Sequence, residues 1–365
     1  VAAPVAAIAP TAGTSTTSAD SRVSGTDRYG TATAAASGFL TRRGNLTTWK
    51  DLVVVSGDNY PDALAANGLA GVKNAPIILL PSDGSLPAIV NEWVLTKRDQ
   101  IQTNSTTSSP FTVWVIGGTS AVPESGVTAL LAVMNSGDLT PAKTTRVSGA
   151  NRAETAQKVA MLKNVAGANI VLAAAKEIFV ASQTGFADAL SIAPYAFNAG
   201  SPVVLTDSAA LGAEAKAVLK AYKTLGGTKI VILGGTAAVS HQVVKDIVTA
   251  GIPMSSMTRL QGADRYATSA AINKWMTATS VNNANFDGTS VVLVNGENFP
   301  DGLAAGQYAA SINATILLVN GATLPATVST WITGKQAYLS DVVAIGGTSA
   351  VPAAAVTAAK TAGTK

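Results

Sequence analysis

The sequence predicts an α/β protein built from three tandem units, each with a parallel sheet covered by helices. Three landmarks recur in the same order: RVSGTDRYGTA, VVVSGDNYPDALAA and VIGGTSAVP in the first copy, with close matches in the other two. Between the landmarks, short apolar runs alternate with Ala-rich stretches of helical period, which is typical of parallel strands joined by helices. The copies begin at Arg22, Arg146 and Arg259 with no long linkers. This spacing predicts three compact units arranged about an approximate threefold axis.

The first unit shows the expected order of elements. Its periodicity predicts helices over residues 28–39, 61–71, 87–97 and 123–134, and strands over 52–55, 76–80 and 113–116. The corresponding strands are expected at 178–181, 203–205 and 230–233, and at 291–294, 316–319 and 342–345. A polar insertion, QTNSTTSS at residues 102–109, is expected to be a surface loop.

The repeats divide the chain at residues 21–140, 141–254 and 255–365, close to the usual domain size of roughly 100–150 residues. Residues 1–20 are rich in Ala, Pro and Thr, which predicts a flexible leader. They lack the positive start and long apolar run of a signal peptide and resemble a mature N-terminus left after cleavage. The sequence therefore favours a secreted protein.

Composition excludes several classes of function. The chain has no Cys and one His, which argues against thiolate metal sites, cysteine nucleophiles and ordinary zinc sites, and we expect no metal and no cofactor. The net charge of +4 and pI of about 9.2 favour an anionic partner. Dense Lys/Arg runs are absent, so nucleic acid is not expected, and no apolar stretch is long enough to span a membrane.

Two arginines recur in each copy of the first landmark, in a chain of which only 13% is charged. Arginine makes planar, bidentate contacts with carboxylate or phosphate. It therefore serves either to lock one repeat against the next or to capture an anion. We expect the earlier set, Arg22, Arg146 and Arg259, to be structural. We expect the later set, Arg28, Arg152 and Arg265, to contact a ligand at the lip of each unit. Because the second copy departs from the pattern at Asn151 and Ala153, its site is expected to be weaker or purely structural.

The other two landmarks each have more than one interpretation. One acidic residue occurs in every second landmark, as Asp62, Asp188 and Asp301. It either complements a helix dipole or pairs with an arginine, and a set of three catalytic carboxylates is the third choice.

The GGT turn joins a strand to a helix and is either a tight crossover or an anion site made of backbone N–H groups. Its glycines are Gly117 and Gly118, Gly234 and Gly235, and Gly346 and Gly347.

These motifs, in this order and three times over, resemble the bacterial cell wall binding repeat 2 family from about Arg22 to the C-terminus. The resemblance implies Rossmann- or Toprim-like units packed as a pseudo-threefold triangle. It also implies noncovalent attachment to a Gram-positive wall through an anionic secondary polymer held in grooves between repeats. The candidate ligand-binding residues comprise the later arginines, the six GGT glycines, and Asp27, Asn151, Asp264, Tyr29 and Tyr266.

We therefore expect a noncatalytic, carbohydrate-binding surface protein whose partner is an anionic cell-wall glycopolymer. One alternative is a structural or adhesive surface protein that assembles with other surface proteins through protein–protein contacts. A wall-modifying hydrolase is a further alternative, against which stands the lack of any non-repeated acid/base constellation.

Overall fold

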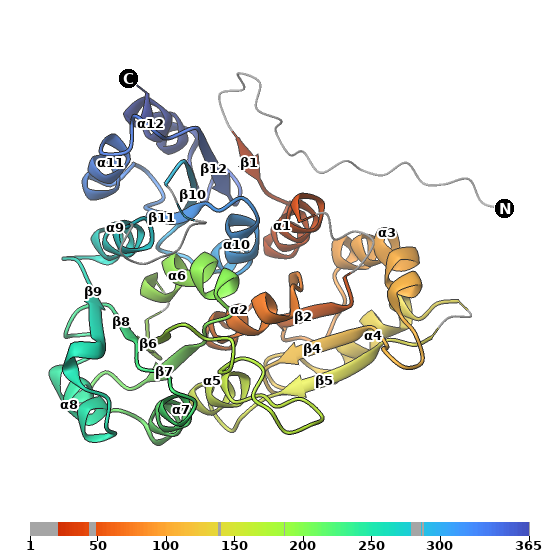
Figure 1. Ribbon diagram of the computed structural model, residues 1–365. Coiled ribbons are helices and arrows are strands. Elements are labelled where there is room, and N and C mark those ends of the chain that lie inside the picture. Colours follow the sequence, from red (N-terminus) through yellow and green to blue (C-terminus); the bar gives the residue numbers. More distant parts are fainter. Residues whose placement is uncertain are drawn as a thin grey trace.

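Three α/β lobes surround a bundle of central helices in the computed structural model of the chain (Figure 1). The structure describes residues 21–43, 49–137, 140–185, 187–278, 286 and 288–364. The expected leader at residues 1–20 lies outside this part of the chain. Within it, no helix is long and apolar enough to cross a membrane.

Each lobe repeats one order of strands and helices. The first contains α1 (Arg28–Arg42), β2 (Asp51–Ser56), α2 (Pro61–Lys73), β3 (Ile77–Leu80), α3 (Ala88–Asn104), β4 (Thr112–Ile116), α4 (Glu124–Met134) and β5 (Lys143–Val147). The second contains α5 (Arg152–Ala160), β6 (Ile178–Ser182), α6 (Ala187–Asn198), β7 (Val203–Thr206), α7 (Ala213–Thr224), β8 (Ile230–Leu233), α8 (His241–Thr249) and β9 (Met257–Leu260). The third contains α9 (Arg265–Met276), β10 (Ser290–Asn295), α10 (Pro300–Ser311), β11 (Thr315–Val319), α11 (Ala326–Thr333), β12 (Asp341–Ile345), α12 (Ala353–Gly363) and the N-terminal strand β1 (Arg22–Val23).

The sheets do not follow the sequence repeats. Their strand orders are β3-β2-β4-β5, β7-β6-β8-β9 and β11-β10-β12-β1, and every pairing is parallel. The strand that opens each sequence repeat is therefore the edge strand of the preceding sheet. For the third sheet this strand is β1, which comes from the start of the chain. The three lobes consequently form a closed ring rather than an open row.

Helices α2, α6 and α10 pack against one another at the centre of this ring. Each also contacts the first helix of another repeat, through the pairs α2–α5, α6–α9 and α10–α1. Small residues allow the close approach of these helices. A Cβ atom on Gly306 of α10 would lie 2.6 Å from Asn67 Oδ1 of α2 and 2.7 Å from Ala193 Cβ of α6. Only a glycine fits there without movement of a neighbour.

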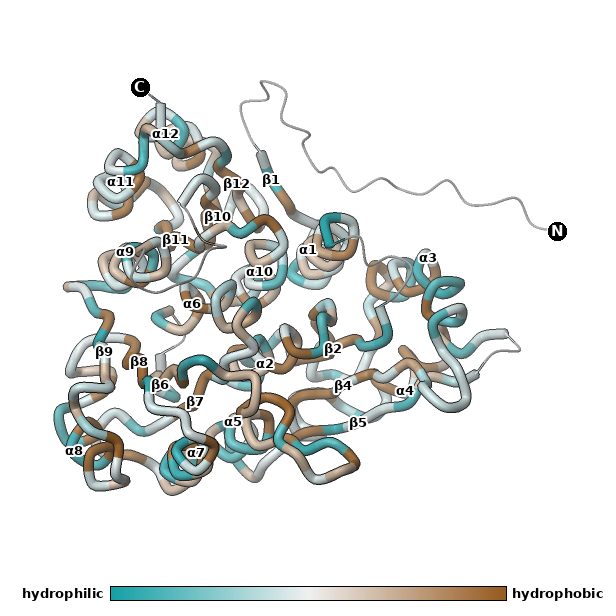
Figure 2. Tube along the Cα trace, in the orientation of Figure 1, coloured by the Kyte–Doolittle hydropathy of each residue, from teal (hydrophilic) through white to brown (hydrophobic). Residues whose placement is uncertain are grey.

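The core runs through the strands and the inner faces of these helices. Residues of β2, β3, β6 and β10 are almost all buried, and Figure 2 shows hydrophobic residues concentrated along the strands. A strand covered by helices on both faces has no solvent-facing side, so its sequence is continuously apolar. These continuous apolar runs are the reason that the strands could be predicted from the sequence.

The expected fold class, three tandem α/β units with parallel sheets, is confirmed, and so are the strands and helices predicted for each unit. The strand β1 was missed because it has only two residues, and β5 and β9 were missed because polar residues interrupt their apolar pattern. The expected surface loop at residues 102–109 was partly wrong. Residues 102–104 belong to α3, and Asn104, 7% exposed, donates to the Trp49 carbonyl at 3.0 Å. Polar composition predicted exposure, but these side chains satisfy buried backbone groups.

Candidate functional site

The repeated turns meet at the carboxyl edge of each sheet. In the first sheet, β2 connects through α2 to β3 on one side, and the chain then crosses to β4 on the other. Such a reversal leaves a crevice between the carboxyl ends of the two strands, where open α/β sheets bind ligands. The turns that follow are Gly57–Asn59 after β2 and Gly117–Gly118 after β4. The other two sheets place their copies of these turns in the same way.

An aspartate lies against the first GGT glycine of each sheet. Asp62 lies in the first turn of α2, with Oδ2 so close to Gly117 that a Cβ atom there would be 2.7 Å away. Gly117 has a φ of +118°, which also favours glycine. Burial raises the pKa of Asp62, although the Thr155 hydroxyl and the Arg152 guanidinium oppose this. Asp62 and Gly117, both of the first repeat, thus pack against each other beside Arg152 and Thr155 of the second repeat.

The same arrangement occurs three times around the ring. Burial raises the pKa of Asp188, opposed by Arg265 and Thr268, and that of Asp301, opposed by Thr31, Arg28 and Arg22. Each aspartate therefore meets the next repeat in turn, and the third meets the first. Among the described residues, none of these carboxylates forms an ion pair within 4.0 Å. Each aspartate lies in the first turn of its helix, as the helix-dipole interpretation expects. The alternative, an ion pair with an arginine, is not formed among the described residues, although an arginine of the next repeat acts on each carboxylate through its charge.

The earlier arginines span the junctions between sequence repeats. Each lies on an edge strand, β1, β5 or β9, and donates from Nη1 to the carbonyl of the first GGT glycine of the preceding repeat in the ring. The pairs are Arg22 with Gly346 at 2.6 Å, Arg146 with Gly117 at 2.8 Å, and Arg259 with Gly234 at 2.8 Å. This contact fixes the strand that opens one repeat to the turn that ends another.

The later arginines bind the other turn of the crevice, within their own sequence repeat. Each is the first residue of its helix and donates from Nη1 to the carbonyl that follows the first strand. The pairs are Arg28 with Gly57 at 2.6 Å, Arg152 with Gln183 at 2.7 Å, and Arg265 with Gly296 at 2.5 Å. Both arginine sets therefore reach the carboxyl edge of a sheet, one at each turn.

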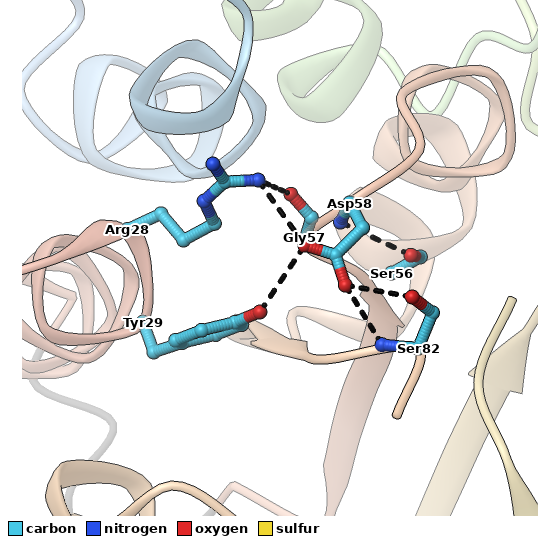
Figure 3. A network of polar contacts seen from close by, with 6 residues as sticks. All are labelled: Arg28, Tyr29, Ser56, Gly57, Asp58 and Ser82. Atoms are coloured by element: carbon cyan, nitrogen blue, oxygen red, sulfur yellow. Dashed lines mark hydrogen bonds and ion pairs between the residues drawn. The ribbon is translucent and has the colours of Figure 1, made fainter. Parts of the chain in front are cut away.

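A polar cluster surrounds Arg28 in the first repeat (Figure 3). Arg28 forms an ion pair of 3.2 Å with Asp58, and the Tyr29 hydroxyl lies 3.3 Å from the same carboxylate. The backbone N–H and hydroxyl of Ser82 donate to the other carboxylate oxygen at 2.8 and 2.9 Å. Burial, followed by the charge of Asp58, raises the pKa of Tyr29 to about 12. The cluster is thus a neutral tyrosine beside a paired acid and base.

The third repeat has a similar arrangement and the second does not. Tyr266 lies 3.3 Å from Glu297 Oε1, as Tyr29 does from Asp58. The second repeat has Ala153 and Thr184 at the two positions. The sequence analysis did not select Asp58 and Glu297 as site residues. The available signal was that both are acidic and lie four positions before the repeated aspartate.

The residues Asp27, Asn151 and Asp264 cap helices. Their side chains accept from the backbone N–H of Gly30 at 2.7 Å, Glu154 at 2.9 Å and Ala267 at 2.7 Å. A capping oxygen satisfies an N–H group that has no partner within the helix. The structure gives these side chains a structural role, which the sequence did not predict. Their expected contact with a ligand remains a prediction.

A glycine and a threonine of the first landmark close the loop before each helix. The Gly25 N–H donates to the Thr31 hydroxyl at 3.2 Å, and a Cβ atom on Gly25 would overlap the backbone of Gly30. Gly149 with Thr155 and Gly262 with Thr268 repeat the contact at 3.0 Å. These threonines are also the ones beside the buried aspartates, a role that the sequence did not suggest. Their recurrence in all three copies was the available signal.

The second GGT glycines face open space. A Cβ atom on Gly118 would meet nothing within 4 Å, and one on Gly235 or Gly347 would meet a side-chain oxygen at 3.7 or 3.9 Å. There is room beside the turns for a ligand. No group of three His, Asp or Glu residues suited to a metal occurs in the described part of the chain.

Comparison with known proteins agrees with this architecture. The chain is 28% identical over 332 residues to the N-acetylmuramoyl-L-alanine amidase LytC of Bacillus subtilis, covering 90% of this chain and 56% of the relative. It is 27% identical over 335 residues to the amidase enhancer of the same organism, covering 91% of this chain and 39% of the relative. The chain thus spans about half or less of the length of these relatives.

Two solved structures from Clostridium difficile have the same fold. Cwp8 superposes with a TM-score of 0.73 at 26% identity, covering 94% of this chain and 52% of that one. Cwp6 superposes with a TM-score of 0.72 at 21% identity, covering 93% of this chain and 47% of that one. The family described as cell wall binding domain 2 (CWB2) matches residues 22–127, 146–244 and 259–356. With three matches that together take in most of its length, the chain belongs to the CWB2 family.

Proposed function

We propose that this chain is a noncatalytic anchor that holds a secreted protein on the wall of a Gram-positive bacterium by binding an anionic secondary wall polymer. The observation that carries the proposal is the threefold match to a cell wall binding family. The partner is a wall polymer, and the location is the cell wall or surface.

Charge supports an anionic polymer as the ligand. The chain has a net charge of +4, and arginine side chains lie at the carboxyl edge of every sheet. A guanidinium group has five donors and can hydrogen-bond to a carbonyl and to an anion at once. Open space at the second GGT glycines lies at the same edge. The proposed ligand therefore lies across the carboxyl edges, near the junctions between repeats.

The use of the repeated side chains supports a noncatalytic role. The aspartates of the crevices are packed against glycine turns, and the acids before the helices act as caps. His241, the one histidine, is exposed at the first position of α8. The match covers 56% of the amidase relative, and we assign attachment rather than hydrolysis to this chain.

A sedimentation assay with purified cell walls tests the proposal. We expect the chain to sediment with intact walls and to stay in solution when the walls have been extracted to remove secondary polymers. Retention on extracted walls would contradict a polymer ligand. Release of labelled fragments from peptidoglycan by the pure chain would contradict the noncatalytic assignment, with a hydrolase as positive control.

A further inference from the structure

We propose that the junction between the first and second repeats is the principal anion-binding junction of the ring, with Arg152 as its main contact. This inference rests on the proposed function and deepens it, because the three junctions would otherwise be equivalent. It reverses the expectation, drawn from the departures at Asn151 and Ala153, that the second copy is the weakest.

The local charges at the three equivalent positions differ in sign. The first repeat has Asp27, Arg28 and Asp58, which sum to one negative charge (−1 + 1 − 1). The third has Asp264, Arg265 and Glu297, with the same sum. The second has Asn151, Arg152 and Thr184, which leave one positive charge (0 + 1 + 0). At these two positions an anion near the first or third arginine meets two carboxylates, whereas an anion near Arg152 meets an amide and a hydroxyl.

Hydrogen bonding separates the first and second sites further. Arg28 is already paired with Asp58 at 3.2 Å, and that carboxylate is held in place by Ser82 (Figure 3). Arg152 donates to the Gln183 carbonyl at 2.7 Å and forms no ion pair within 4.0 Å among the described residues. Its guanidinium has further donors in a planar fork that matches a phosphate or carboxylate.

The surroundings of Arg152 suit a sugar-linked anion. The guanidinium lies 5.9 Å from the centroid of the Tyr60 ring, which belongs to the first repeat. An aromatic face beside a cation offers apolar contact to a sugar ring and electrostatic contact to its charged group.

Three acidic groups lie near this site, and each is already engaged. Asp62 is half-buried and hydrogen-bonded to the Thr155 hydroxyl. Glu154 is paired with Lys158 at 3.1 Å, and Asp207 accepts from the Gln183 side chain. Because Arg152 belongs to the second repeat and Tyr60 to the first, an anion held between them would contact both repeats.

Arginine variants of the whole chain test this inference with inorganic polyphosphate and polygalacturonate as separate probes in titration calorimetry. The two probes distinguish a phosphate ligand from a carboxylate ligand. We expect Arg152→Gln to weaken binding of the preferred probe roughly tenfold, as the loss of a charge-assisted hydrogen bond implies. The same change at Arg28 should have a clearly smaller effect. Arg98→Gln, at a half-buried arginine of α3 far from the repeated turns in sequence, is the neutral control. An equal loss for Arg28→Gln and Arg152→Gln, or none for Arg152→Gln, overturns the assignment.

A charge transplant provides a second test that leaves Arg152 in place. Thr184 is exposed and occupies the position of Asp58. Thr184→Asp should give Arg152 a carboxylate neighbour and weaken probe binding as Arg152→Gln does. Asp58→Asn should instead strengthen binding, because it releases Arg28. Unchanged affinity for Thr184→Asp in a folded protein contradicts the inference.

The wall assay separates the two proposals. If the wild type sediments with walls and Arg152→Gln sediments equally well, the junction assignment is wrong and the proposed function stands. If the wild type does not bind walls at all, the proposed function fails whatever the probes show.

Discussion

Gln307 of α10 is hydrogen-bonded through both ends of its side-chain amide to the backbone of Ile77 in β3, 230 residues earlier. Its Oε1 accepts from the Ile77 N–H at 2.7 Å, and its Nε2 donates to the Ile77 carbonyl at 2.7 Å. Gln307 is 0% exposed. The amide thus completes the open edge of the first sheet with a group from the third repeat, as a further strand would.

Replacing Gln307 tests how much this contact contributes. Gln307→Ala leaves a buried N–H and a buried carbonyl without partners, and each costs about 1–3 kcal/mol. We expect the free energy of unfolding to fall by about 2–6 kcal/mol in denaturant titrations. Gln261→Ala, at an exposed glutamine, is the control and should change it by less than about 0.5 kcal/mol.

The contact between α2 and α6 depends on Gly71. A Cβ atom there would overlap the carbonyl oxygen of Phe197 in α6. Gly71→Ala should therefore force the helices apart and lower the melting temperature by several degrees. Gly118→Ala adds a methyl group in open space and serves as the matched control. A melting temperature for Gly71→Ala equal to that of the control would show that the helices adjust freely.

The earlier arginines are expected to stabilise the ring. Arg259→Ala removes the donor to the Gly234 carbonyl and should lower the free energy of unfolding by about 1–3 kcal/mol. Arg98→Ala, whose side chain is 38% exposed, is the comparison and should have little effect. Loss of wall binding by Arg259→Ala without loss of stability would instead assign this arginine to the ligand.

The buried aspartates predict a pH dependence. Burial raises the pKa of Asp62 above its ordinary value of 3.8, so the folded state holds this proton at pH values where the unfolded chain has lost it. Stability from this group is therefore present at low pH and lost as pH rises through that window. Asp62→Asn should make the unfolding free energy fall less between about pH 4 and 7 than it does in the wild type. A steeper fall in the variant would contradict the raised pKa.

Wall binding should weaken as salt rises. Contacts between an anionic polymer and half-exposed arginines are screened over about 10 Å at 0.1 M salt. We expect the fraction sedimented with walls to fall progressively as sodium chloride is raised to about 1 M. Binding that does not change over this range would indicate neutral sugar recognition, with Tyr29 and Tyr266 as the first residues to replace.

The sequence predicted the parts of the fold that depend on local patterns. Continuous apolar runs such as Ile77–Leu80 identify buried strands, and the repeated landmarks identify the turns. It did not predict that β5 joins the sheet of the preceding repeat, because strand pairing depends on long-range contacts that a polar segment does not reveal. The sequence also placed the later arginines at the carboxyl edge of the sheet but did not predict that Asp58 pairs with Arg28. Ion pairing depends on the distance between side chains in space, which the order of residues along the chain does not give.

The pairing of β1 with β12 has a consequence for how many units the protein can hold. An open array of repeats exposes an end face at each terminus and grows or shrinks by whole units, with special caps to cover the ends. Here β1 pairs with β12, so among the described strands the first and third repeats cover each other. A duplicated or deleted repeat would therefore leave α2, α6 and α10 unable to meet at one centre. The geometry of closure therefore sets the number of repeats in the ring at three.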